Sequence, residues 1–311
     1  MTDSALRGVV LEGTGGVWRV HAADGATHDA SLRGRLKQDD APRLAVGDDV
    51  TIVRDEAGDA WAISEIHPRR SQLARRAPGM RSGERVVIAN VDQVVVVFAF
   101  VAPEPHPRMI DRFFLIAEAN DIAARLVMNK CELIDDAAAN AFVEPFRRAG
   151  YPVHFTSVKA GVGLDALHDV LRGRVSALSG PSGVGKSSLL NAMYPGAGLR
   201  VGEISESVNK GRHTTVGARL LPLPDGGFVA DTPGLREVGL WGIEAAAVDH
   251  CFPEFGPYLG HCKFQDCSHD HEPGCAVRIA VERGDVDAAR HASYLKLRAE
   301  LAASNAAWEA R

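Results

Sequence analysis

The chain of 311 residues exceeds the usual size of a single domain, so its length predicts two or three domains. Its apolar share of 46% and charged share of 24% are those of a soluble globular protein, and its net charge of −5 gives no global signature of nucleic-acid binding. The N-terminal stretch lacks the pattern of a secretory signal, and the longest apolar run, 94–102, is too short to span a bilayer. We therefore expect a cytoplasmic protein that does not associate with membranes.

The N-terminal part of the chain, up to residue 66, has the pattern of short strands separated by glycine turns. Five strands of this kind suit a small β-barrel, and the OB-fold is the best-populated choice. Such barrels often bind oligonucleotides, but a packing or regulatory domain would have the same pattern. The predicted strands are 7–12, 17–21, 29–33, 49–54 and 61–66.

An arginine-rich linker is predicted at 69–90, after a barrel domain at 1–68. A run of like charges is usually a solvated face of a protein. Arginine without lysine, in a segment that contains proline and glycine, favours instead a strap that binds phosphate groups. The arginines, opposed only by Glu84, are Arg69, Arg70, Arg75, Arg76, Arg81 and Arg85.

A third region, 91–242, alternates between predicted strands and helices. The strand at 93–100 is a continuous apolar run, which is typical of a strand buried on both faces. Alternating units of this length predict an α/β domain with a parallel sheet. The other elements expected here are a helix at 107–120, a strand at 124–129, a helix at 135–149, a strand at 152–156, a helix at 163–172, strands at 175–178 and 227–230, and a helix at 188–193.

The strand at 124–129 ends in Asn129, Lys130, Cys131 and Glu132, which resembles the N-K-x-D motif by which GTPases recognise guanine. In that motif the Asn contacts the base edge, the Lys packs along the base, and the acid accepts hydrogen bonds from N1–H and the N2 amino group of guanine. Adenine lacks this pair of donors, so an acid here selects guanine. Glu132 departs from the motif, because its carboxylate sits one methylene further out than that of Asp. Ser157 follows the next strand, where a second loop at the base edge is expected.

A nucleotide-binding loop is predicted at 180–188, which fits the pattern G-x-x-x-x-G-K-[ST] between a strand and a helix. A glycine-rich turn at this place lets backbone N–H groups wrap a phosphate at the positive end of the helix. Lys186 would reach the β- and γ-phosphates, and the hydroxyl of Ser187 would ligate Mg²⁺. The predicted binding residues are Gly180, Pro181, Ser182, Gly183, Val184, Gly185, Lys186, Ser187 and Ser188.

Two segments further along the chain predict contacts to Mg²⁺ and to the γ-phosphate. The polar, glycine-containing segment 209–215 suits a switch loop whose threonine completes the Mg²⁺ shell. The strand at 227–230 runs into Asp231, which would hold Mg²⁺ through water, and Gly234, whose N–H would sense the γ-phosphate.

Water activation is the one function for which the usual residue is missing. Many GTPases place a glutamine directly after this glycine, but here the position holds Leu235, which cannot orient water. We therefore expect slow intrinsic hydrolysis and activation by a partner. His213 is the candidate for positioning water, because a neutral imidazole can accept a hydrogen bond from it; the alternative is that His213 only orders the switch loop.

The order of these motifs along the chain is itself informative. A conventional GTPase begins with the phosphate-binding loop and ends with the base motifs, whereas here the base motif at Asn129 precedes the loop at Gly180. The sequence therefore predicts a circularly permuted GTPase domain, in which every strand keeps its neighbours and only the connections differ.

The C-terminal region carries a cluster of potential metal ligands within 14 residues, spaced C-x4-C-x-H-x5-C. This spacing predicts a closed tetrahedral Zn²⁺ site rather than a set of disulfides. Its ligands would be Cys262, Cys267, Cys275 and either His269 or His271, whereas His250, Cys251 and His261 are interpreted as incidental. Two amphipathic helices are expected after it, at 276–283 and 285–302, with an apolar stripe for core packing.

Taken together, these motifs resemble the RsgA (YjeQ) family of bacterial small ribosomal subunit biogenesis GTPases over essentially the whole chain. The resemblance extends to 68–71, 211–215, 252–255 and 274–277. It implies an OB-like barrel, a circularly permuted P-loop GTPase domain at 91–242, and a helical zinc-binding domain at 243–311. It favours His269 as the fourth ligand of one structural Zn²⁺ per chain. Between Thr214 and Thr215, we favour Thr215 as the Mg²⁺ ligand, although Val216 replaces a third threonine that is usual in the family.

The resemblance also implies an activity. It predicts a GTP phosphohydrolase that binds the 30S subunit late in its assembly and hydrolyses GTP to GDP and phosphate with stimulation by the subunit. The expected partners are the 30S subunit and its 16S rRNA, and we expect a monomer. Two rival hypotheses are a binding switch in which hydrolysis is incidental and an ATP-driven remodeller of nucleic acid; the acid at Glu132 argues against ATP.

Overall fold

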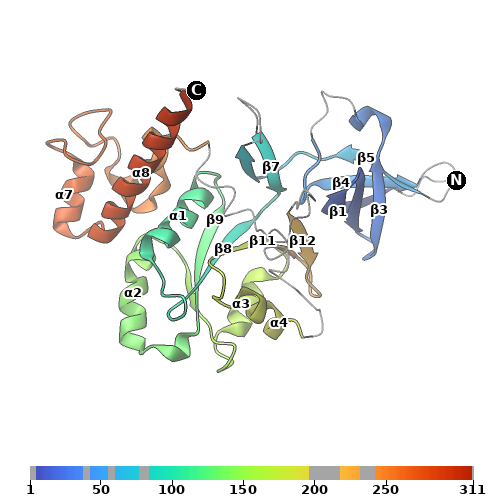
Figure 1. Ribbon diagram of the computed structural model, residues 1–311, viewed down its shortest axis with the longest axis horizontal. Coiled ribbons are helices and arrows are strands. Elements are labelled where there is room, and N and C mark those ends of the chain that lie inside the picture. Colours follow the sequence, from blue (N-terminus) through green and yellow to red (C-terminus); the bar gives the residue numbers. More distant parts are fainter. Residues whose placement is uncertain are drawn as a thin grey trace. The chain divides into compact units, whose positions relative to one another are not determined.

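The structure, a computed structural model, describes residues 5–37, 43–54, 60–76, 84–195, 218–231 and 242–309 (Figure 1). By its internal packing the chain divides into two compact units, each built from segments that are not consecutive. The first unit comprises Met1–Gln93, Leu167–Leu178 and Ser187–Val238. The second comprises Val94–Ala166, Ser179–Lys186 and Gly239–Arg311.

The first unit begins with a closed five-stranded barrel of strand order β1-β2-β3-β5-β4. Its strands are β1 (Leu6–Thr14), β2 (Val17–Ala22), β3 (Thr27–Leu32), β4 (Asp49–Arg54) and β5 (Trp61–Ile66). β3 and β5 are parallel and the other neighbours are antiparallel. Alternate residues of a strand, such as Val50 and Ile52 of β4, belong to the buried core of the barrel. The prediction of an OB-like barrel is confirmed.

The segment predicted as a linker contains regular structure. β6 (Gln72–Arg76) and β7 (Glu84–Ala89) pair antiparallel as a separate two-stranded sheet. The sequence pattern did not indicate this pair, because neither strand alternates regularly between polar and apolar residues.

The arginine at the start of this segment is bound to the barrel. Arg69 donates from Nε to Oδ1 of Asp48 at 2.7 Å and from an Nη atom to Oδ2 at 2.9 Å, and its guanidinium also donates to the Arg43 carbonyl at 2.7 Å. Asp48 is fully buried, so the Arg69–Asp48 ion pair fixes the start of this segment to the barrel. Arg70 instead pairs with Asp92 at 2.7 Å and remains 62% exposed.

The GTPase region contains a six-stranded sheet of order β10-β9-β8-β11-β13-β12. Its strands are β8 (Gln93–Ala99), β9 (Ala123–Asn129), β10 (Val153–Phe155), β11 (Val175–Ser179), β12 (Arg219–Pro222) and β13 (Phe228–Asp231). β10 lies parallel to β9, and β11 parallel to β13. β8 is buried along its whole length, as its apolar run predicted. β12 pairs antiparallel with β13 and was not predicted, because four residues ending in proline give too short a signal.

Within the described ranges, α-helices lie where the sequence predicted them, although some of their ends differ. They are α1 (Pro107–Glu118), α2 (Asp136–Arg148), α3 (Leu164–Leu171), α4 (Lys186–Met193), α7 (Ala276–Arg283) and α8 (Ala288–Glu309). Short 3₁₀ turns add η1 (Gly34–Lys37), η2 (Cys131–Leu133), η4 (Ala245–Cys251) and η5 (Pro253–Tyr258). Across the described ranges, no helix combines the length and the apolar character needed to cross a bilayer.

Within the second unit, a buried arginine joins α8 to α1 and η5. Arg290 is 2% exposed, donates to Glu254 at 2.7 and 3.0 Å, and also donates to the buried Asp111. Its guanidinium lies 4.7 Å from the centre of the Phe252 ring. The Arg290 charge is thus paired with the carboxylates of Glu254 and Asp111. A buried arginine is tolerated only when its charge is paired in this way.

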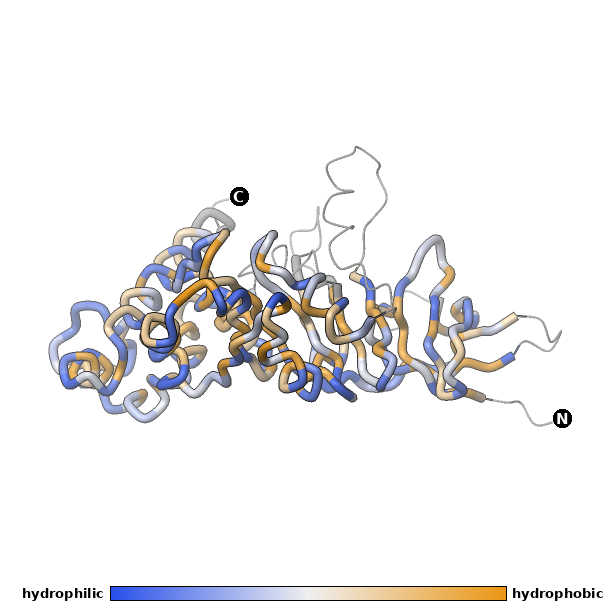
Figure 2. Tube along the Cα trace, turned by 90° about the horizontal axis from the view of Figure 1, so that it is seen from below, coloured by the Kyte–Doolittle hydropathy of each residue, from blue (hydrophilic) through white to orange (hydrophobic). Residues whose placement is uncertain are grey.

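Apolar residues follow the strands and the inner faces of the helices, whereas the loops preceding α7 are mostly hydrophilic (Figure 2). Those loops, 261–275, therefore have few side chains with which to form a core of their own.

Candidate guanine-nucleotide and metal sites

The loop between β11 and α4 has the backbone that a phosphate-binding turn requires. Gly180, Gly183 and Gly185 have φ values of +136°, +82° and +98°, which side-chain-bearing residues rarely adopt. A Cβ atom at Gly180 would lie within 3.0 Å of the Val97 carbonyl oxygen at the end of β8. Glycine at this position is therefore required both by the backbone conformation and by the close approach of a neighbouring strand.

Lys186 lies at the first position of α4 and folds back over the loop. Its Nζ donates to the carbonyl oxygens of Gly180 at 2.9 Å and Pro181 at 2.8 Å. Ser182 and Ser188 are exposed, whereas Val184 is buried. Ser187 is half-buried in the first turn of α4. The lysine and the loop backbone are thus held together in the arrangement that a phosphate-binding loop uses.

Asn129 links the base motif to this loop. It is 3% exposed at the end of β9, and its Nδ2 donates to the carbonyl oxygen of Val184 at 2.8 Å. Its Oδ1 accepts from the hydroxyl of Thr156 at 3.2 Å. The sequence predicted a contact of Asn129 with the base, and the structure adds a second role, which is to hold the two loops in register.

Lys130 has a left-handed backbone (φ +58°) that directs the chain away from β9. Its ammonium donates to the carbonyl oxygens of Ala102 at 2.7 Å and Gly183 at 3.0 Å. The lysine therefore bridges the phosphate-binding loop and the segment after β8. The sequence did not predict its contact with Ala102, because a backbone carbonyl leaves no signal in a motif.

Glu132 is exposed in η2 and lies beside the loop that follows β10. A hydrogen bond from the Ser157 hydroxyl keeps the pKa of the Glu132 carboxyl below its ordinary value. Ser157 is fully buried and also accepts from the Ala160 amide at 2.9 Å, so its orientation is fixed. Cys131, directly before Glu132, is half-buried, and burial raises the pKa of its thiol.

The switch residues are only partly covered by the structure. Asp231 is the last residue of β13, and its backbone is paired with Arg219 of β12. His213, Thr215 and Gly234, predicted for water positioning, Mg²⁺ and γ-phosphate, lie outside the described residues. A metal held by Ser187 and Asp231 fits the donor chemistry, because Mg²⁺ prefers hydroxyl, carboxylate and water oxygens.

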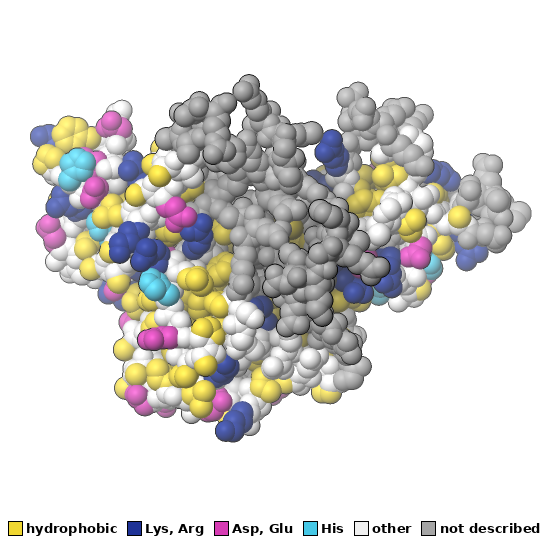
Figure 3. Space-filling model, in the orientation of Figure 1, with side chains coloured by type: hydrophobic (Ala, Val, Ile, Leu, Met, Phe, Trp, Pro, Cys, Tyr) yellow, Lys and Arg dark blue, Asp and Glu magenta, His cyan; other side chains and the backbone are white. Residues whose placement is uncertain are grey.

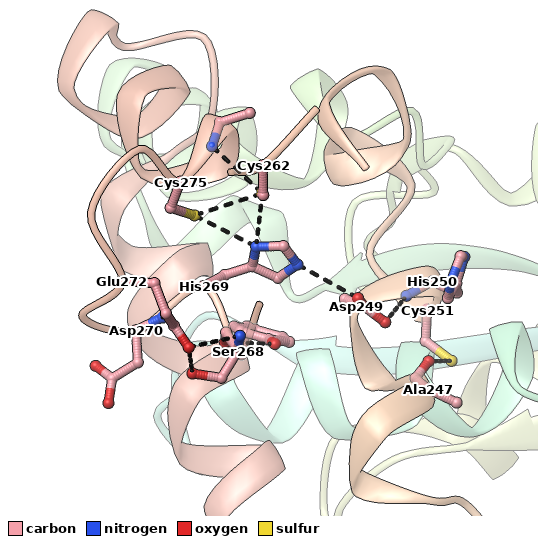
Figure 4. Close-up of polar contacts among 12 residues, drawn as sticks. Ala247, Asp249, His250, Cys251, Cys262, Ser268, His269, Asp270, Glu272 and Cys275 are labelled. Carbon is pink, nitrogen blue, oxygen red and sulfur yellow. Dashed lines mark hydrogen bonds and ion pairs between the residues drawn. The ribbon is translucent and has the colours of Figure 1, made fainter. Parts of the chain in front are cut away.

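A second cluster lies in the loops before α7 (Figure 4). The ligand atoms of Cys262, Cys267, His269 and Cys275 all lie within 4.8 Å of one another. Nδ1 of His269 is 3.3 Å from Sγ of Cys275 and 3.6 Å from Sγ of Cys262. Three thiols and one imidazole converging in this way could hold a zinc ion in a tetrahedral site.

The surroundings of the cluster orient its ligands. Oδ2 of Asp249 lies 3.3 Å from Nε2 of His269, which leaves Nδ1 facing the sulfur atoms (Figure 4). Backbone amides of Ala276 and Arg278 at the start of α7 donate to the sulfur atoms of Cys262 and Cys275, both at 3.4 Å. A carboxylate behind a ligating histidine and amides on thiolates are the usual outer shell of a metal site.

His271, the alternative ligand, lies outside the cluster of Cys262, Cys267, His269 and Cys275. The side chain of His271 is 82% exposed and contacts Asp270. Cys251 lies apart from the cluster, donating to the Ala247 carbonyl at 3.6 Å. Asp249 was not predicted, because it stands 20 residues before His269 and only the folded chain brings the two together.

Fold and sites together define a circularly permuted GTPase with an N-terminal barrel and a C-terminal Cys₃His cluster. A model of the RsgA GTPase family matches residues 66–241, and this chain belongs to that family. It is accordingly an enzyme that acts on GTP.

Relatives match nearly the whole chain. A small ribosomal subunit biogenesis GTPase RsgA from Gemmatimonas aurantiaca is 61% identical over 304 residues, covering 97% of this chain and 99% of the relative. The protein of the same name from Azotobacter vinelandii is 41% identical, covering 94% of this chain and 85% of the relative.

Two solved structures also match nearly the whole chain. YjeQ from Thermotoga maritima has a TM-score of 0.80 at 33% identity and covers 96% of this chain and 98% of its own. YloQ, described as a circularly permuted GTPase, has a TM-score of 0.76 at 28% identity and covers 96% of both chains.

Proposed function

We propose that this GTPase binds the small (30S) ribosomal subunit late in its maturation and that the subunit stimulates hydrolysis of GTP to GDP and phosphate. The observation that carries the proposal is the near-complete match to relatives named small ribosomal subunit biogenesis GTPase. It includes the barrel and the metal cluster as well as the nucleotide site. A GTPase used for another purpose would need to share only the nucleotide site.

In this proposal the phosphate-binding loop and the base motif act on the two ends of one nucleotide. The backbone N–H groups of 180–188 cradle the phosphates, and Lys186 leaves its loop carbonyls to bind the β- and γ-phosphates. Glu132 accepts from the N1–H and N2 amino group of guanine, and the hydrogen bond from Ser157 supports its ionised carboxylate. Asn129 and Lys130 keep both loops at a constant separation.

Ser187, Thr215 and Asp231 are the residues that we propose to hold Mg²⁺, directly or through water. The metal, when bound, would neutralise charge that develops on the phosphate oxygens. Gly234 would contact the γ-phosphate through its N–H. Since Leu235 cannot orient the attacking water, His213, a group of the ribosomal subunit or a backbone group must do so. Single-turnover hydrolysis by His213→Ala at saturating subunit would separate these, with slowing of about 100-fold expected if His213 positions the water.

We propose that Cys262, Cys267, His269 and Cys275 hold one Zn²⁺ per chain in a structural role. These protein ligands would fill all four positions of a tetrahedral ion, which would leave none open for a substrate. The metal would replace the hydrophobic core that the polar loops 261–275 lack.

Contact with the 16S rRNA is proposed to be spread over several places. On the face shown in Figure 3, the lysines and arginines among the described residues form separate groups interspersed with acidic and apolar side chains, not one continuous basic surface. Arg70, which is 62% exposed, can offer its guanidinium to a phosphate, whereas Arg69 is bound to Asp48. We further propose that the protein acts as a monomer in the cytoplasm, where small subunits are assembled.

Co-sedimentation with purified small subunits tests this proposal. The protein should sediment with subunits in the presence of a non-hydrolysable GTP analogue and less with GDP. Lys186→Ala, which weakens phosphate binding, should remove the difference between the two nucleotides. Equal sedimentation with large subunits, or with ATP and GTP analogues alike, would contradict the proposal and favour a general nucleic-acid remodeller.

A further inference from the structure

The hairpin formed by β12 and β13 connects the two segments proposed to hold magnesium. Asp231 is the last residue of β13, and Arg219 pairs with it across the ladder as the first residue of β12. In the sequence, Arg219 follows Thr215 by four residues. Arg219 is therefore paired in the ladder with Asp231, one proposed Mg²⁺ residue, and is near Thr215, another, in the sequence.

The barrel contacts this end of the hairpin through an ion pair. Nε of Arg219 lies 3.2 Å from Oε2 of Glu12 on β1. The other oxygen of the same carboxylate, Oε1, accepts from Arg19 on β2 at 2.7 Å. Glu12 is thus held by its own barrel on one side and binds the hairpin with the other. Its side chain is 29% exposed, and that of Arg219 is 43% exposed.

A second contact holds the opposite end of the hairpin. The rings of His21 on β2 and Phe228 at the start of β13 meet edge to face, with 5.8 Å between their centres. The Phe228 amide also donates to the Arg174 carbonyl at 2.8 Å, just before β11. Because barrel contacts exist at both ends, the hairpin cannot shift along its length without breaking one of them.

We propose that Glu12 and Arg219 are positioning residues for magnesium binding, through which the barrel sets the place of the Asp231 backbone. This inference rests on the proposed role of Asp231 in holding Mg²⁺. In this proposal neither residue contacts nucleotide or metal, and the pair acts through the β12–β13 ladder. Because the pair is partly exposed, its loss should change the magnesium requirement by up to about fivefold rather than abolish binding.

The test uses the full-length chain and a fluorescent non-hydrolysable GTP analogue titrated with MgCl₂. Glu12→Gln and Arg219→Gln should each raise the Mg²⁺ concentration for half-maximal tightening of analogue binding by about two- to fivefold. The double variant should raise it no further than one single variant, since the two residues act as a pair. Binding of fluorescent GDP without magnesium should stay as in the wild type, which a general structural defect would not allow.

Arg19→Gln is the matched control, because it removes the other partner of Glu12 and the same charge without touching β12. It should shift the magnesium requirement less than either Gln variant does, because the Glu12–Arg219 pair itself remains. The inference is overturned if both Gln variants behave as the wild type, or if Arg19→Gln shifts the requirement as much as they do. A wild type that binds guanine nucleotides without any effect of magnesium would instead overturn the proposed function, and the inference with it.

Discussion

A Cβ atom on Gly185 would lie within 3.0 Å of the Nδ2 atom of Asn129, a distance that Cβ atoms essentially never adopt. The phosphate-binding loop and the base motif, 56 positions apart in the chain, are therefore packed directly against each other. The Asn129 amide occupies the space that a side chain at 185 would take, and it binds the Val184 carbonyl just before it. The two halves of the nucleotide site act as one structural unit.

This packing predicts that Gly185→Ala weakens nucleotide binding through both motifs. Asn129 would have to leave its two hydrogen bonds, each worth about 1 kcal/mol, so affinity for GDP should fall by about tenfold or more. Gly150→Ala is the matched control, because Gly150 has the same φ of +98° but open space around its Cβ. Both variants should lose about 1–2 kcal/mol of stability from the left-handed backbone, and Gly185→Ala should lose more because of the displaced Asn129. Only Gly185→Ala should lose affinity for GDP; equal affinities would contradict the proposed coupling.

Guanine selectivity should depend on Glu132. Glu132→Gln should weaken GDP binding by roughly 10- to 100-fold, the size of a hydrogen-bond pair to a charged acceptor, without affecting the fold, because the residue is exposed. Competition between guanine, xanthine and adenine nucleotides is the measurement. A wild type that binds ATP as tightly as GTP would rule out this role.

The same carboxylate gives a dependence on pH. Glu132 must be ionised to accept from guanine, and the Ser157 hydrogen bond lowers its pKa. Affinity should therefore be constant above this lowered pKa and fall as pH drops through it. Removing the hydroxyl with Ser157→Ala raises the pKa, so the loss of affinity should begin at a higher pH. Identical pH profiles for the two proteins would mean that Ser157 does not support the carboxylate.

Metal content tests the C-terminal cluster. Protein purified without added zinc should contain one Zn²⁺ per chain, and Cys262→Ser combined with Cys267→Ser should abolish it. Cys251→Ser, which changes a thiol outside the cluster, should keep the metal. Asp249→Asn should retain zinc with affinity lowered by about 10- to 100-fold, because Asp249 only orients His269. Full metal content in the double cysteine variant would place the ligands elsewhere.

Neighbouring arginines in the linker should behave differently. Arg69→Ala should destabilise the protein by about 1–3 kcal/mol, because it leaves the fully buried Asp48 without its ion pair. Arg70→Ala should affect stability little and should lower the salt dependence of subunit binding by about one unit of slope if it contacts a phosphate. Thermal unfolding measures the stability of each variant, and binding to small subunits across a salt series measures the slope. An unchanged slope for Arg70→Ala would show that Arg70 serves only as the surface partner of Asp92.

What the sequence predicted well depends on local patterns. The barrel strands follow from short runs separated by glycine turns, β8 from its unbroken apolar run, and the phosphate-binding loop from glycines that the backbone itself requires. In each case the residues that determine the structure are neighbours in the chain, so a short window contains the whole signal.

The parts that sequence reasoning missed depend on partners far apart in the chain. Arg69 belongs to a segment whose composition predicts a phosphate-binding strap. In the folded chain, however, it binds Asp48, which is 21 positions away in the sequence. Asp249 gains its role only beside His269, and β12 becomes a strand only by pairing with β13. Charge and propensity show what such residues can bind, but their partner is chosen by the tertiary structure.

The most direct test of the account is GTP turnover with and without purified small ribosomal subunits. We expect slow hydrolysis by the protein alone, since Leu235 occupies the place of a water-orienting glutamine, and a large acceleration by small subunits. Large subunits should give no acceleration, and ATP should not be hydrolysed in either case. Turnover that is the same with and without small subunits would contradict the central claim and leave a switch in which hydrolysis is incidental.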